Sequence, residues 1–120
     1  MYLKRIPNLT ITEIRDSFQK KEEAAILSST RKNEDIILLS EYGKNINSIN
    51  FSNELIKDTS KNIAFLISGS NGFSLNIQSK ADKMISLSSM TFPHEIARLL
   101  LIEQIYRAQT IQQGSPYHRE

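Results

Sequence analysis

The sequence predicts an α/β domain with a parallel sheet, and two patterns lead to this prediction. Residues 36–39 (IILL) and 63–67 (IAFLI) are continuous apolar runs, typical of strands that are covered on both faces. Segments rich in helix-forming residues lie between such runs, and alternation of strands with helices favours parallel pairing. A chain of 120 residues can bury a core as one domain, so we predict a single domain over residues 1–120.

Four further elements are expected along the chain. Residues 9–14 (LTITEI) are rich in β-branched side chains and partly alternating, which predicts a more peripheral strand. Residues 20–29 (KKEEAAILSS) predict a helix, and residues 75–83 (LNIQSKADK) a shorter one. Residues 84–87 (MISL) predict another strand.

A helix is also expected within residues 51–60 (FSNELIKDTS). Ser52 stands where a serine hydroxyl would cap the first helical turn. Leu55 and Ile56 are then expected to face the core.

From Pro93 to about Gln113 nothing in the sequence interrupts a helix, and proline is tolerated in a first helical turn. At about 100° per residue its apolar side chains point in nearly every direction. They are Ile96, Ala97, Leu99, Leu100, Leu101, Ile102, Ile105, Tyr106 and Ala108. A helix that is apolar all round must be covered all round, and a small sheet covers only one side. We therefore predict a homodimer with this helix at the interface.

Composition excludes several classes of site. The absence of cysteine excludes disulfides and thiolate metal sites, and it suits a reducing cytoplasm. The only histidines, His94 and His118, have no companions at metal-ligand spacing, so we expect no metal. A net charge of +2 permits an RNA partner without showing a basic arm. The longest apolar run, residues 63–67, is far shorter than a membrane helix, so no membrane partner is expected.

Residues 68–73 (SGSNGF) directly follow the most apolar predicted strand. Ligands of open α/β sheets gather at the carboxyl ends of strands, where glycines such as Gly69 and Gly72 let the backbone approach them. An ordinary strand-to-helix turn, with Asn71 and Gly72 at positive φ, explains the segment equally well. It is neither a GxGxxG fingerprint nor a P-loop, since it lacks the lysine.

Two later segments also carry groups suited to ligands. In residues 86–94 (SLSSMTFPH) the small hydroxyl residues could bind a ligand, or Thr91 could simply cap the following helix. The tail combines Tyr117, His118 and Arg119, which are a stacking ring, a titratable group and a fixed cation. That combination suits a flipped base or a phosphate, although short polar tails are often disordered.

Residues 91–120 (TFPHEIARLLLIEQIYRAQTIQQGSPYHRE) closely resemble the C-terminal third of the ribosomal RNA large subunit methyltransferase H family. They match that family's T-(L/F)-P-H, R-x-(L/V)-(L/V)-x-E-x-(L/V)-Y-R-A and Y-H-(R/K) motifs almost without a break. The SGSNG and LSSMTF segments lie before them at the family's spacing. The resemblance covers nearly the whole chain, weakly before Asp35 and strongly after Ile63.

The resemblance implies a SPOUT-type knotted methyltransferase fold, with a parallel sheet, a C-terminal trefoil knot and a long C-terminal helix. It implies S-adenosylmethionine as cofactor, held in the knot by the end of one strand before an L-x-x-x-G turn, by the glycine loop and by the segment before T-F-P-H. The corresponding cofactor-binding residues are Leu39, with Gly43 closing the turn, and Ser68, Gly69, Leu87, Ser88, Ser89, Met90, Thr91 and Phe92.

The implied reaction is methylation of the N3 position of a pseudouridine in 23S ribosomal RNA within an assembled ribosome. The implied site is composite, because the tail of one subunit of a homodimer reaches the cofactor of the other. We assign Arg119 to stabilising negative charge on the ring, His118 to accepting its proton and Tyr117 to the same catalytic tail. His94 and Arg107 are expected to bind the substrate.

This chain departs from the family pattern at three places. Ser68 replaces the first glycine of a G-G-x-x-G loop, and Ser40 stands where an acidic residue is usual. Residues 1–7 (MYLKRIP) align with the end of the family's first helix, so a strand inside the family's sheet is missing. We therefore expect translation to begin roughly twenty residues upstream and this form to be less stable than an extended one. The competing interpretations are an inactive remnant of the enzyme and a flavodoxin-like nucleotide-binding module.

Overall fold

The computed structural model describes residues 9–28, 34–56, 62–69, 72–88, 90 and 92–114. In chain order its elements are β1 (Leu9–Ile14), the 3₁₀ turn η2 (Asp16–Phe18), α1 (Gln19–Ser28), β2 (Glu34–Asn45), α2 (Ser48–Phe51), the π-helical turn η3 (Ser52–Ile56), β3 (Asn62–Ser68), α3 (Leu75–Lys80), β4 (Lys83–Ser86) and α4 (His94–Gln112).

The strands of the described residues form one parallel sheet in the order β1-β3-β2-β4. The predicted α/β class with a parallel sheet is therefore confirmed, and β1 is at an edge as expected. Strand β1 pairs directly with β3, from Leu9 opposite Ile63 to Ile14 opposite Ser68. Strand β1 thus lies directly beside β3, and the expectation that a strand of the family's sheet is missing stays a prediction.

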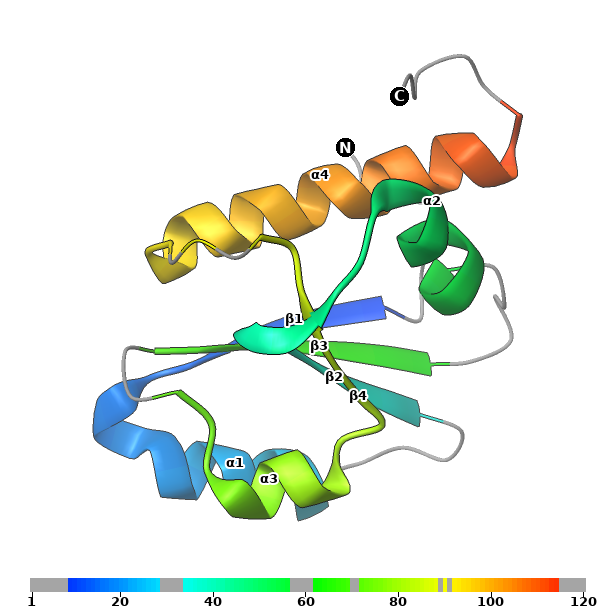
Figure 1. Ribbon diagram of the computed structural model, residues 1–120. Coiled ribbons are helices and arrows are strands. Elements are labelled where there is room, and N and C mark those ends of the chain that lie inside the picture. Colours follow the sequence, from blue (N-terminus) through cyan, green and yellow to red (C-terminus); the bar gives the residue numbers. More distant parts are fainter. Residues whose placement is uncertain are drawn as a thin grey trace.

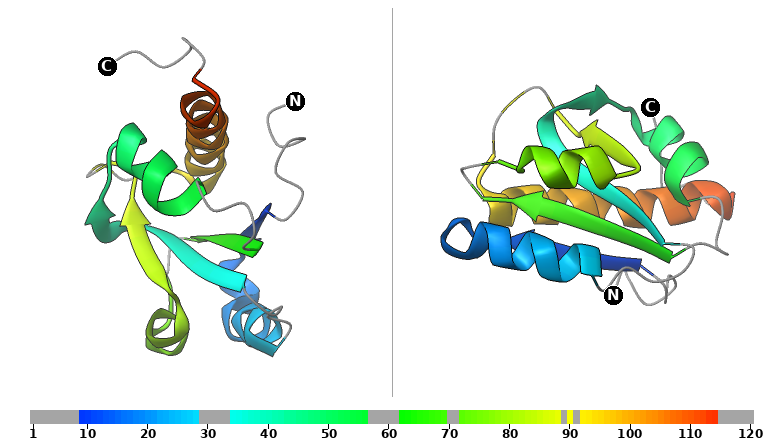
Figure 2. Two further views of the ribbon diagram at one scale, coloured as in Figure 1. Left: turned by 90° about the vertical axis from the view of Figure 1, so that its right-hand side faces the viewer. Right: turned by 90° about the horizontal axis from the view of Figure 1, so that it is seen from below.

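Helices cover both faces of the sheet, which explains why the central strands are apolar without alternation. Helices α1 and α3 lie on one face, and α2, η3 and α4 lie on the other (Figures 1 and 2). Successive side chains of a strand point to opposite faces. Accordingly Ile37 and Leu39 of β2 join the core under α4, whereas Ile36 and Leu38 join the core against α1 and α3.

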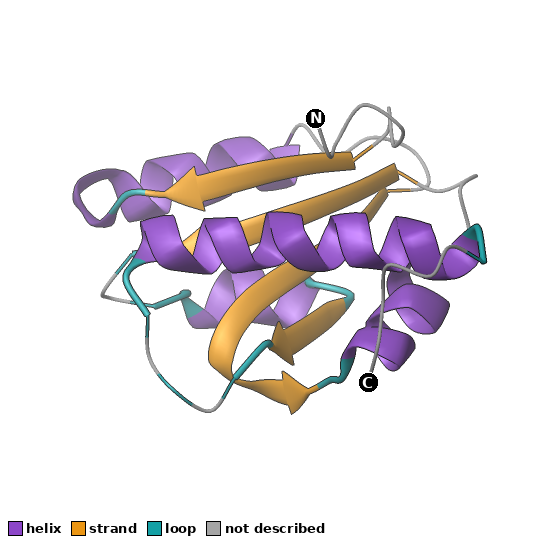
Figure 3. Cartoon of the chain, turned by 90° about the horizontal axis from the view of Figure 1, so that it is seen from above, coloured by secondary structure: helices purple, strands orange, loops and turns teal. Residues whose placement is uncertain are grey.

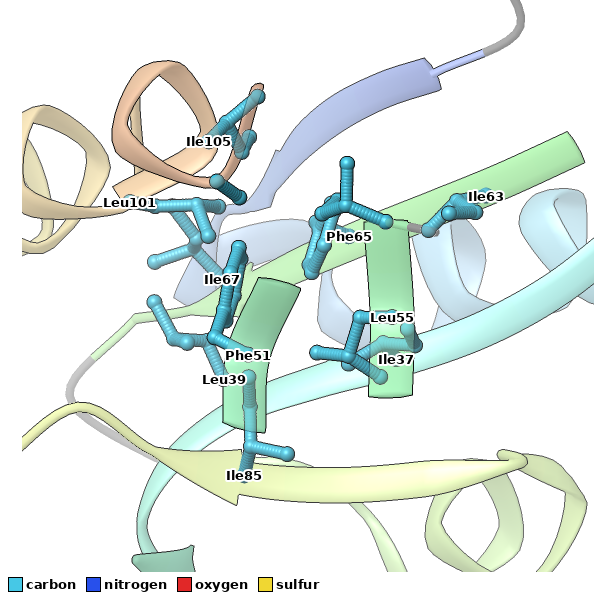
Figure 4. Close-up of a cluster of buried hydrophobic side chains, with 12 residues drawn as sticks. Ile37, Leu39, Phe51, Leu55, Ile63, Phe65, Ile67, Ile85, Leu101 and Ile105 are labelled. Atoms are coloured by element: carbon cyan, nitrogen blue, oxygen red, sulfur yellow. The ribbon is translucent and has the colours of Figure 1, made fainter. Parts of the chain in front are cut away.

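The larger core lies between the sheet and α4 (Figures 3 and 4). Phe51 of α2 and Phe65 of β3 stack there, with ring centroids 6.0 Å apart. Leu101 and Ile105 reach the same cluster from α4, and both are fully buried. The long predicted helix is confirmed, ending where Gly114 adopts a φ of 72°.

The predicted cap at Ser52 is wrong. The helix begins earlier, and the side-chain oxygen of Asn47 accepts the capping hydrogen bond from the backbone N–H of Asn50 at 2.8 Å. The Ser52 hydroxyl is instead buried and donates to the carbonyl oxygen of Ala108 in α4, at 3.2 Å. Leu55 and Ile56 are buried as predicted.

Helix α4 keeps part of its apolar surface uncovered in one chain. Leu101, Ile105 and Ala108 are buried against the sheet side, but Ile96 and Leu99 are 43% and 61% exposed. The predicted homodimer interface would cover this surface, and it stays a prediction. No helix within the described ranges is long and apolar enough to cross a bilayer.

Candidate functional site

A cavity of ≈ 750 Å³ lies at the carboxyl ends of β2, β3 and β4. This edge of an open parallel sheet is where ligands bind in α/β proteins. Its walls come from the end of β2, the turn after β3, the segment after β4 and the first turns of α4. The lining residues are Leu39, Ser40, Glu41, Tyr42, Ile67, Ser68, Gly69, Gly72, Phe73, Gln78, Met84, Ser86, Leu87, Ser88, Met90, Phe92, Pro93, His94, Ala97 and Leu100.

One wall is an arch in β2. Leu39 and Lys44 both align with Ile85 of β4, so the residues between them bulge away from the ladder. At Gly43 a Cβ atom would stand 2.7 Å from the backbone of Ile85, a distance that real Cβ atoms do not adopt. The L-x-x-x-G pattern therefore requires glycine at this position, because any side chain would push β2 and β4 apart. The arch itself places Tyr42, 84% exposed, at the cavity wall.

The glycine turn after β3 forms a second wall. The backbone N–H of Gly72 donates to the carbonyl oxygen of Gly69 at 3.2 Å, and Gly72 has a φ of 71° that favours glycine. Gly72 thus takes the positive φ expected of a tight turn, whereas Asn71 lies outside the described residues. Both glycines line the cavity, so the segment is a turn and a candidate ligand loop at once.

The third wall is the segment after β4, whose shape is stabilised by hydrogen bonds of Ser86 and Ser88. The buried Ser86 hydroxyl donates to the carbonyl oxygen of Ser88 and accepts from the Ser88 N–H. The Ser88 hydroxyl in turn accepts from the N–H of Met90 at 3.1 Å. These hydroxyls shape the loop. Helix α4 follows with Pro93 at its N-cap and no side-chain cap bond, and Thr91, the predicted cap, lies outside the described residues.

A charged cluster ties the start of α4 to the edge strand. Glu13 at the end of β1 accepts a hydrogen bond from the Arg98 guanidinium at 3.2 Å. Its other oxygen lies 3.5 Å from Nε2 of His94, which is also 3.1 Å from the Glu95 carboxylate. Glu13 therefore anchors the first turn of α4, where His94 lines the cavity.

The cavity brings together all the described residues that were predicted to bind the cofactor. Leu39, Ser68, Gly69, Leu87, Ser88, Met90 and Phe92 all line it. Ser89 and Thr91 belong to the same predicted set but lie outside the described residues. The predicted catalytic residues Tyr117, His118 and Arg119 also lie outside them.

The two predicted substrate-binding residues lie far apart within the chain. His94 is at the cavity, whereas Arg107 lies roughly 20 Å further along α4. The Arg107 guanidinium pairs with Glu103 one turn earlier, at 3.0 Å, and Arg107 does not line the cavity. Within one chain the structure does not bring Arg107 to the site.

Sequence reasoning missed several residues of the walls, among them Tyr42, Phe73 and Gln78. Tyr42 lies inside the L-x-x-x-G pattern that was recognised, so an aromatic residue between Leu39 and Gly43 was the available signal. Gln78 gave no such signal, because it reaches the cavity only through the packing of α3 on the sheet.

Comparison with known proteins identifies the class to which this fold and cavity belong. Residues 1–118 match the family described as "Predicted SPOUT methyltransferase". The chain is 53% identical over 120 residues to ribosomal RNA large subunit methyltransferase H of a strain of Prochlorococcus marinus, covering all of this chain and 83% of that protein. It is 50% identical over 119 residues to the protein of that name from a strain of Synechococcus, covering 99% of this chain and 83% of that protein.

A solved structure of the SpoU methyltransferase AviRb from Streptomyces viridochromogenes, in complex with AdoMet, superposes with a TM-score of 0.49 at 15% identity, over 78% of this chain and 34% of that one. The chain belongs to the SPOUT methyltransferases. Within that class it is a member of the ribosomal RNA large subunit methyltransferase H family. Membership leaves the flavodoxin-like interpretation without support.

Proposed function

We propose that this chain transfers a methyl group from S-adenosylmethionine to N3 of a pseudouridine in 23S ribosomal RNA. The substrate in this proposal is the assembled ribosome, in the cytoplasm, and the enzyme is a homodimer. The observation that carries the proposal is the convergence of three separate sequence segments on one cavity. Those segments are the ones that the family resemblance assigns to the cofactor, and the relatives' names supply ribosomal RNA as the substrate.

The cavity suits S-adenosylmethionine in size and chemistry. Its ≈ 750 Å³ falls within the roughly 300–1,000 Å³ of small-molecule and cofactor sites. Leu39, Leu87 and Phe92 offer apolar surface to an adenine ring, while the glycine turn and the segment after β4 offer backbone groups at close range. Ser68 adds a side chain at the wall where the family pattern has glycine, and the cavity is present with that serine in place.

The reaction does not require a covalent intermediate between the protein and the substrate. When bound, S-adenosylmethionine supplies a methyl group from its sulfonium, which becomes a neutral thioether as the new N3–methyl bond forms. The protein must align donor and acceptor and favour loss of the N3 proton. In the proposal His118 accepts that proton, and Arg119 stabilises the negative charge on the ring.

The homodimer completes the site in this proposal. The exposed Ile96 and Leu99 of α4 provide apolar surface for a partner subunit. Arg107, remote from the cavity of its own chain, and the tail residues Tyr117 to Arg119 then serve the cavity of the partner. The proposal also includes a trefoil knot formed by the C-terminal segment. Only the family resemblance supports the knot.

The competing interpretation within the family is a remnant that keeps the fold but binds no cofactor. Calorimetric titration of the 120-residue chain with S-adenosylmethionine separates the two, because a remnant shows no binding. Incubating the chain with 70S ribosomes, or with free 23S RNA, then tests the substrate. Mass spectrometry of nucleosides should show N3-methylpseudouridine on the ribosomes. Binding without methylation of either RNA would overturn the assigned reaction while leaving the cofactor in place.

A further inference from the structure

Helix α1 carries a buried acidic residue that the proposed reaction does not use. The side chain of Glu23 is only 3% exposed, although it lies on a helix that faces solvent on its other side. Burying a carboxylate is costly unless hydrogen bonds replace the water that it loses. The partners of Glu23 therefore indicate what this side chain is for.

All the described partners of the Glu23 carboxylate are donors, and two of them come from the residue just after the glycine turn. Ser74 donates its backbone N–H at 3.2 Å to one oxygen and its hydroxyl to the other. Gln19, one turn earlier on α1, donates to Glu23 at 3.3 Å. The same Gln19 amide donates to the carbonyl oxygen of Gly72 at 2.9 Å.

These hydrogen bonds hold the end of the glycine turn, where the chain leads into α3. Gly72 is the residue whose N–H closes the turn onto Gly69, and Gly72 and Phe73 line the cavity. Ser74 then begins α3, since its hydroxyl accepts from the N–H of Ile77. Helices α1 and α3 lie on the same face of the sheet (Figures 1 and 2). Gln19 and Glu23 therefore connect α1 to the end of the turn through hydrogen bonds.

We propose that Glu23, supported by Gln19, is a positioning residue that holds the glycine turn in the shape that binds the cofactor. This inference rests on the proposed cofactor site and adds to it a residue outside the cavity. A carboxylate suits the role because it only accepts hydrogen bonds, and each of its described partners donates one to it. Charge-assisted bonds of this kind are also stronger than neutral ones.

The discriminating variant is Glu23→Gln, which keeps the size of the side chain but points an amide NH₂ at a donor. Glu22→Gln is the matched control. Glu22 is the adjacent residue on α1, receives the same substitution and bonds to Arg15 rather than to the turn. A second test variant, Gln19→Ala, keeps the Glu23 carboxylate and its bonds to Ser74 but removes the bonds of Gln19 to Gly72 and to Glu23. Gln19 is only half-buried, so this change threatens folding less.

Two measurements are needed, both made at a temperature well below the melting temperature of each variant. The first is the Kd for S-adenosylmethionine by calorimetry. Hydrogen bonds to charged groups contribute roughly 1.5–3 kcal/mol, so Glu23→Gln should raise the Kd about ten- to a hundred-fold. The second is amide hydrogen exchange of peptides covering residues 68–74 without cofactor, which should become faster. Gln19→Ala should change both in the same direction by less, and Glu22→Gln should change neither.

The possible results separate cleanly. If Glu23→Gln lowers the melting temperature but leaves the Kd and the exchange of the turn unchanged, Glu23 is a core-stabilising group and the proposal fails. Equal weakening by Glu22→Gln would also overturn it, because the effect would then belong to the helix as a whole. If the parent chain binds no cofactor, the proposed function fails, and the exchange comparison still decides whether Glu23 holds the turn.

Discussion

At position 43 the backbones of β2 and β4 approach too closely for any side chain. A Cβ there would stand 2.7 Å from backbone atoms of Met84 and Ile85, which cannot move aside as a flexible side chain could. We expect Gly43→Ala to lower stability by about 1–3 kcal/mol, the usual effect of overpacking, and to weaken cofactor binding by opening the arch. Thermal unfolding and calorimetry measure the two effects.

Gly114→Ala is the appropriate comparison for that variant. Gly114 also rejects a side chain, but through its φ of 72° at the end of α4, with open space around it. It should therefore cost about 1–2 kcal/mol without changing cofactor affinity. If Gly43→Ala behaved like Gly114→Ala in both measurements, the arch would have no part in shaping the cavity.

Gly69 tests the placement of the cofactor directly. It lies in the cavity wall at the end of β3, where a β-branched side chain would keep a ligand away from the backbone. We expect Gly69→Val to abolish measurable binding of S-adenosylmethionine while the chain stays folded by circular dichroism. Unchanged affinity in a folded variant would mean that the cofactor lies elsewhere.

An ion pair between Arg15 and Glu22 links the end of β1 to α1. The Glu22 carboxylate accepts hydrogen bonds from the backbone N–H of Arg15 at 2.8 Å and from its guanidinium at 2.7 and 2.9 Å. The backbone bond, followed by the side-chain bonds, lowers the pKa of Glu22 below its ordinary 4.5. The ionised form is thus favoured in the folded chain.

This direction of shift sets a pH dependence of stability. Because the folded pKa lies below the unfolded value, Glu22 stabilises the fold above about pH 4.5, and the stabilisation is lost as pH falls through the folded pKa. Glu22→Gln should therefore lower the melting temperature at pH 7 and differ little from the parent near pH 3. The change in melting temperature should be small, because the Arg15 side chain is 68% exposed and water screens the ion pair. An equal difference at both pH values would contradict this account.

The proposed site needs two subunits of the homodimer. Removing residues 117–120 should leave dimerisation and cofactor binding largely intact and eliminate methylation. A mixed dimer of a tail-less subunit and a Gly69→Val subunit provides the sharper test. One of its two sites combines an intact cavity with the partner's tail, so part of the activity should return. No activity in the mixed dimer, with both parents confirmed as dimers, would place tail and cavity in the same subunit.

Short sequence patterns were enough to predict the elements whose burial follows a local pattern. Continuous apolar runs predicted the two central strands, β-branched residues predicted the edge strand, and an unbroken stretch predicted α4. The family motifs predicted the cofactor residues, and every described member of that set lines the cavity. These signals lie within short segments, because burial on one or both faces leaves its mark on neighbouring residues.

Contacts between residues that are far apart in the chain could not be predicted from these patterns. Ser52 looks like a helix cap in its own segment, yet its hydroxyl serves the carbonyl of Ala108, 56 residues away. Glu23 looks like a surface charge on a helix of good formers, yet it is buried against Ser74, 51 residues away. Hydrophobic periodicity records that a side chain is buried, but not against what. The order of the strands and the packing of the helices supply that partner, and with it the role of the residue.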